Sequence, residues 1–83
     1  MRVELGENQV IELQKTNPAH RSRGGFQAFM VQLQKRMKGN AIDLEHEDLI
    51  KINRYASYTQ GGYQNRLKRI FGPTLGKYLH GLR

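Results

Sequence analysis

The chain has 83 residues, a formal net charge of +7 and a hydrophobic fraction of 37%. A chain this short forms one small domain, residues 1–83, and its lack of cysteine argues against a disulfide-stapled secreted scaffold. No apolar run approaches the roughly 18 residues of a membrane span, and the first residues lack an apolar signal core. We therefore expect a soluble cytoplasmic protein with no membrane partner.

Residues 1–15 predict a β-hairpin. Val3 and Leu5 alternate with charged neighbours, residues 6–8 have turn chemistry, and residues 10–13 supply an apolar return strand. An isolated hairpin is barely stable in water, so its apolar face is expected to pack on helices.

A basic loop is expected over residues 16–25, and residues 26–83 are expected to be helical. Apolar residues recur there at helical spacing. The expected helices cover residues 26–37, 45–57 and 63–71, followed by a short helix from Pro73. Gly72-Pro73 is expected to stop or kink the third helix, and residues 41–44 form a short extended piece that could add to the hairpin. The predicted fold class is α+β, with an N-terminal β-hairpin packed on three to four short helices.

A short motif occurs twice: Gly24-Gly25-Phe26-Gln27 recurs as Gly61-Gly62-Tyr63-Gln64, and each copy opens a basic helix. A helix start exposes backbone N–H groups and the positive end of the helix dipole, which favours a phosphate. Alternatively, the glycines supply positive φ angles or allow close packing. The repetition is either the duplication of a helical unit or a chance match.

Residues 46–71 resemble a helix-turn-helix, with residues 63–71 as the helix that reads DNA. Ala56 fits the small residue of the first helix, although Gly61 falls one residue late for the turn. Gln and Asn in the second helix can pair with adenine, and Arg can pair with guanine. The alternative is an ordinary helical hairpin with a solvated cationic face.

The acidic residues fall into two groups, and residues 13–42 and 49–83 contain none. Such cationic stretches attract polyanions. Tyr58, among several arginines, could stack on a base, although core packing is the usual role of tyrosine in a small domain. The candidate nucleic-acid-binding residues are cationic, amide-bearing or aromatic: Arg21, Arg23, Lys35, Arg36, Lys38, Arg54, Tyr58, Gln64, Asn65, Arg66, Lys68 and Arg69.

Catalytic and cofactor motifs are not evident in the sequence. His46, Glu47 and Asp48 are adjacent on an expected helix and point in different directions, so they do not make a metal site. No nucleotide-binding loop is present. We expect neither enzymatic activity nor a cofactor.

These patterns predict a small non-enzymatic nucleic-acid-binding protein, with DNA preferred over RNA, that binds through a cationic helical face. The alternative is a small regulatory or inhibitory module that docks on an acidic protein surface or on the nucleic-acid channel of a larger complex. Binding to free nucleic acid with steep salt dependence separates the two. Charge reversal of Arg66 and Arg69 is expected to abolish binding without unfolding the domain. The oligomeric state is left open.

Overall fold

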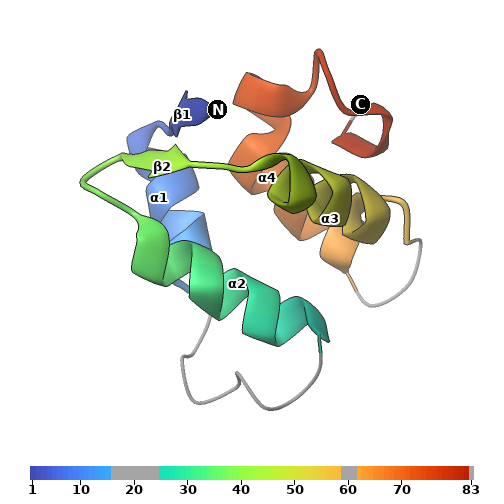
Figure 1. Cartoon of the computed structure of the whole chain (residues 1–83), viewed down its shortest axis with the longest axis horizontal. Coiled ribbons are helices and arrows are strands. Elements are labelled where there is room, and N and C mark those ends of the chain that lie inside the picture. The colour runs from blue at the N-terminus through green and yellow to red at the C-terminus, as the bar shows by residue number, and fades with distance from the viewer. Residues whose placement is uncertain (16–24, 59–61, 83) are drawn as a thin grey trace.

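The computed structural model describes residues 1–15, 25–58 and 62–82 (Figure 1). Within these ranges the elements follow in the order β1 (Arg2–Glu4), α1 (Glu7–Gln14), α2 (Gly25–Arg36), β2 (Ala41–Asp43), α3 (His46–Ala56), α4 (Tyr63–Leu75) and the 3-10 helix η2 (His80–Leu82). The α+β class is confirmed, because a two-stranded antiparallel sheet packs with four α-helices in the described part of the chain.

The strand that pairs with β1 is β2, in the register Arg2↔Asp43, Val3↔Ile42 and Glu4↔Ala41. The extended piece expected near residues 41–44 is thus confirmed and forms half of the sheet. The prediction that residues 10–13 form the return strand of a hairpin is wrong, since they lie in helix α1.

The physical reason is the spacing of apolar residues in α1. Leu13 is fully buried, Val10 three residues earlier is half-buried, and Ile11 between them is 52% exposed. Burial at an interval of three follows the helical period and not the alternation of a strand. Glu7 in the first turn also suits the helix dipole.

Helices α2 and α3 begin and end within one residue of the expected bounds. Helix α3 starts with a capping box. The Glu45 side chain accepts the backbone N–H of Asp48, and the Asp48 carboxylate accepts the backbone N–H of Glu45 at 2.7 Å.

Helix α4 runs through Pro73 to Leu75, so the predictions of a stop at Gly72-Pro73 and of a separate helix from Pro73 are wrong. A proline normally disfavours helix at the preceding residue because its ring clashes with that residue's Cβ, but Gly72 has no Cβ. Leu75 is fully buried and holds the last turn in the core.

The core is one cluster that draws on the sheet, the four α-helices and η2. At one end of the molecule the N-termini of α2 and α4 meet the C-terminus of α3 (Figure 1). We call this the aromatic end. The sheet, the C-terminus of α2 and the start of α3 lie away from it, and we call that region the sheet end.

Candidate nucleic-acid interface

The aromatic residues of the two glycine motifs meet at the aromatic end. The ring of Phe26 stacks on the ring of Tyr63, with centroids 4.0 Å apart and planes inclined by 15°. These two residues follow the glycines in the two copies. The starts of α2 and α4 are therefore neighbours, although 37 residues separate the motifs in the chain.

Tyr55 and Tyr58 complete the aromatic cluster. Tyr55 meets Phe26 edge-on at 5.2 Å and Tyr63 at 5.9 Å, and it is half-buried. Tyr58 contacts Tyr55 at 5.8 Å but keeps 46% of its surface exposed. Tyr55 and Tyr63 thus have the packing role that is usual in a small domain. Tyr58 packs against Tyr55 and leaves part of its ring exposed to solvent.

Two of the motif glycines have roles in the backbone and in packing. Gly62, the N-cap of α4, has φ 75°, a left-handed conformation that favours glycine. At Gly25, an added Cβ would lie 2.7 Å from the Tyr55 hydroxyl, so a side chain at this position would require the Tyr55 ring to move. Gly24 and Gly61 lie outside the described residues. The first turns of α2 and α4 hold no acidic residue among the described positions, so no carboxylate of their own offsets the positive ends of these helices.

Arg66 and Arg69 do not form a free basic face on α4. Arg66 Nη2 donates to the backbone oxygen of Glu12 at 3.2 Å, and Arg69 Nε donates to Glu12 Oε1 at 3.2 Å. Arg66 thus adds a positive charge from α4 to the C-terminal end of α1, next to the C-cap residue Lys15. Both arginines therefore join α4 to α1.

The Glu12 carboxylate is the centre of this contact. Lys15 Nζ lies 3.2 Å from Glu12 Oε2 on the other side. Burial raises the pKa of Glu12, but hydrogen bonds from Lys15 and Arg69 outweigh burial and leave the pKa below its ordinary value. Burial also lowers the pKa of the half-buried Arg66 guanidinium. Reversing the charge of Arg66 and Arg69 would place carboxylates beside Glu12, so that double variant is expected to destabilise the fold.

Arg36 is likewise engaged within the protein. Its Nη2 lies 2.8 Å from Asp48 Oδ2, and it also donates to the backbone oxygen of Asp43. The hydrogen bond from Arg36 lowers the pKa of the buried Asp48 carboxyl, against the opposing effect of burial. The same bond raises the pKa of Arg36. Arg36 thus ties the end of α2 to β2 and to the start of α3.

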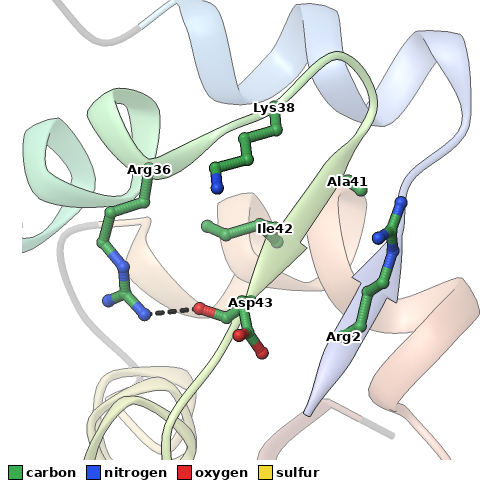
Figure 2. Close-up of a pocket in the computed structure, with 6 residues that line it drawn as sticks. All are labelled: Arg2, Arg36, Lys38, Ala41, Ile42 and Asp43. Carbon is green, nitrogen blue, oxygen red and sulfur yellow. Dashed lines mark hydrogen bonds between the residues drawn. The ribbon is translucent and has the colours of Figure 1, made fainter.

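The exposed residues Lys35 and Lys38 lie beside this link at the sheet end. Figure 2 shows Arg36 and Lys38 on one side of β2 and Arg2 on the other, around a shallow depression of about 170 Å³. The Asp43 carboxylate lies in the same depression and offsets part of its positive charge. Arg2 is not among the predicted binding residues, because only the pairing of β1 with β2 brings it to this place.

The other predicted residues lie on α3 and α4 or outside the described residues. Arg54 is exposed in the last turn of α3, Asn65 is exposed, and Gln64 and Lys68 are half-buried on α4. Arg21 and Arg23 fall outside the described residues. Lys51 is a further exposed cation on α3 that was not among the predicted residues, and its Nζ lies 5.6 Å from the ring centroid of Phe29. Its position three residues before Arg54, on the same face of α3, was the available signal.

Helices α3 and α4 pack against each other, as a helix-turn-helix or an ordinary helical hairpin would require. Part of the basic surface of α4, the proposed reading helix, faces α1 through Arg66 and Arg69. Among the exposed candidates, Tyr58 belongs to the aromatic cluster, Arg54 precedes Tyr55 in the last turn of α3, and Asn65 lies in the first turn of α4. Most of the predicted residues that the structure describes thus lie at the aromatic end, in the α1–α4 contact or at the sheet end.

No family model, curated protein or solved structure matches this chain. In residues 1–15, 25–58 and 62–82, His, Asp and Glu do not gather in groups of three that could hold a metal ion. The helices described for this chain are all too short or too polar to span a membrane.

Proposed function

We propose that the protein is a non-enzymatic cytoplasmic nucleic-acid-binding protein, with DNA preferred over RNA, and that the aromatic end is its contact surface. The observation that carries the proposal is the meeting of two helix starts without acidic side chains beside the exposed Arg54 and Tyr58. Positive helix ends and guanidinium groups favour phosphates, and an exposed tyrosine ring can stack on a base.

The distribution of acidic residues supports this choice over the sheet end. Asp43, Glu45 and Asp48 lie at or next to the sheet end, where Asp43 and Glu45 border the depressions near Lys35 and Lys38. By contrast, the first turns of α2 and α4 carry no described acid. A polyanion approaching the aromatic end therefore meets less repulsion from carboxylates.

Fluorescence anisotropy with labelled duplex DNA, single-stranded DNA and RNA, at about 50 and about 200 mM salt, tests the proposal. The informative variant is Arg54→Glu, and its matched control is Lys35→Glu, which reverses the charge of another exposed residue at the sheet end. We expect Arg54→Glu to weaken binding more than Lys35→Glu. Equal losses would exclude the aromatic end as the contact surface, and no binding at low salt would exclude the function.

A protein partner is the second candidate, and the outer face of α3 favours it. Ile50 is 45% exposed and lies with Glu47, Lys51 and Arg54 along a depression of about 230 Å³. An exposed apolar side chain among cations suits an acidic protein surface better than a phosphate backbone. If the protein ignores nucleic acid, affinity capture with Ile50→Asp as the control variant tests this candidate, and identical capture by both proteins would contradict it.

A further inference from the structure

Strand β1 has a free hydrogen-bonding edge. Leu5 N donates to Asn40 O at 2.8 Å, and Leu44 N donates to Met1 O at 2.7 Å. Hydrogen bonding alternates along an antiparallel pair, so Val3 also faces β2, whereas the backbone groups of Arg2 and Glu4 point away from it. In the described part of the chain nothing bonds to the backbone N–H or C=O of these two residues.

The outer edge of β2 is already hydrogen-bonded to residues that precede the strand in the chain. Lys38 and Ala41 exchange backbone hydrogen bonds of 2.8 and 3.1 Å, and Arg36 donates to the Asp43 oxygen. The two edges of the sheet therefore differ. In Figure 1, β1 lies at the margin of the molecule with β2 on its inner side. An unpaired edge of this kind is a template for pairing with another strand.

The side chains on β1 indicate which strand could pair with its free edge. Val3 is buried against the core, while the side chains of Arg2 and Glu4 are 72% and 69% exposed and share one face, with Nη2 and Oε1 3.9 Å apart. We infer that β1 pairs antiparallel with β1 of a second copy, so that Arg2 lies opposite Glu4 of the partner subunit on both sides of a two-fold axis at Val3. Each such pair exchanges both of its backbone hydrogen bonds.

The charges select this register over its neighbours. A slip by two residues in one direction places Arg2 opposite Arg2 of the partner subunit, and a slip in the other direction places Glu4 opposite Glu4 of the partner subunit. Like charges directly opposite each other are unfavourable. A slip by one residue turns the side chains of one strand to the wrong face. Only the register centred on Val3 pairs opposite charges throughout.

The resulting dimer has one continuous sheet that crosses the two-fold axis. Its contact area is small, so the dimer is weak and forms at high protein concentration. The aromatic end lies away from β1 and stays uncovered in both copies (Figure 1). This inference does not depend on the proposed function.

Sedimentation equilibrium from about 10 µM to about 1 mM, the range in which weak contacts become populated, tests the dimer with a charge exchange. We expect a reversible monomer–dimer equilibrium for the wild type. Arg2→Glu alone and Glu4→Arg alone should each weaken it about tenfold, because each places like charges opposite one another. The double variant Arg2→Glu/Glu4→Arg should restore dimerisation, because it exchanges the two partners of each pair.

A melting curve for each variant shows that it is folded, and amide exchange locates the interface. Exchange of the Glu4 amide should slow as the concentration rises, whereas that of Val3, already bonded to β2, should not change. A protein that stays monomeric at about 1 mM would overturn the inference. So would a dimer that the double variant fails to restore, or one in which the Glu4 amide is unaffected.

Discussion

The link from Arg36 to Asp48 gives a quantitative test of what holds the sheet end together. Arg36→Met keeps much of the side chain's length but removes both hydrogen bonds, to the Asp48 carboxylate and to the Asp43 backbone oxygen. Asp48 is buried, with 12% of its side chain exposed, whereas the Arg36 side chain is 36% exposed. The carboxylate would therefore lose its charged partner in a largely dry site.

The stability lost in Arg36→Met should lie between the contribution of an exposed ion pair and that of a hydrogen bond to a charged group. An exposed ion pair contributes about 0.2–1 kcal/mol, and a hydrogen bond to a charged group contributes about 1.5–3 kcal/mol. Because only Asp48 is well buried, we expect Arg36→Met to lower the free energy of unfolding by about 2 kcal/mol. Lys35→Met, at the exposed neighbouring position, is the control and should change it by less than about 0.5 kcal/mol.

Urea denaturation of Arg36→Met, Asp48→Asn and the double variant measures the coupling directly. We expect a coupling free energy of at least about 1 kcal/mol. A loss below about 0.5 kcal/mol for Arg36→Met, or independent effects of the two substitutions, would refute the role given to this link.

The link also has a pH signature. Arg36 holds the pKa of Asp48 below its ordinary value of 3.8 in the folded protein. The stability that this bond provides is complete above the unfolded-state pKa and is lost as the pH falls through the folded-state pKa. The wild type should therefore lose more stability than Arg36→Met between about pH 5 and about pH 2.5, and equal losses would contradict the assignment.

Three further substitutions test other parts of the fold by the same denaturation measurement. Leu13→Ala should cost about 2–4 kcal/mol and Ile11→Ala less than about 1 kcal/mol, because only Leu13 lies in the core; similar losses would contradict a helix at residues 7–14. Gly62→Ala should cost about 1 kcal/mol because of the φ of 75°, and an unchanged midpoint would argue against that conformation. Glu12→Gln should cost about 1 kcal/mol at neutral pH and less in acid, because the pKa of Glu12 is lowered; the same cost at both pH values would count against its ion pairs.

Local pattern predicted the helices that have a strong amphipathic period. In α2 the core residues Phe26, Phe29, Met30 and Leu33 follow that period, and only the buried Val31 lies outside it, so the bounds of α2 could be predicted from the sequence. Helix α1 offers just three apolar residues in eight, and Ile11 and Leu13 alone fit a strand equally well. The choice depends on Leu13 packing in the core, which is a tertiary effect.

The strand pairing and the availability of the basic residues depend on contacts between residues that are distant in the chain. The partner of β1 lies about forty positions away, and no local pattern identifies it. The hydrogen bond of Arg69 to Glu12 spans 57 positions, so a basic residue that appears free in the sequence is paired in the fold. Positive charge could be counted from the sequence, but which cations stay available for a partner depends on these contacts.

The pairing of β1 with β2 constrains the order in which the chain can fold as it is synthesised. β1 has no neighbouring strand until residues 41–43 have left the ribosome, and α1 packs against α4, whose residues are made later still. Strand β1 and helix α1 therefore lack their native partners until most of the polypeptide has been synthesised. Closing such distant contacts slows folding relative to a simple helical bundle. The N-terminal half is thus expected to gain its structure together with the C-terminal half and not ahead of it.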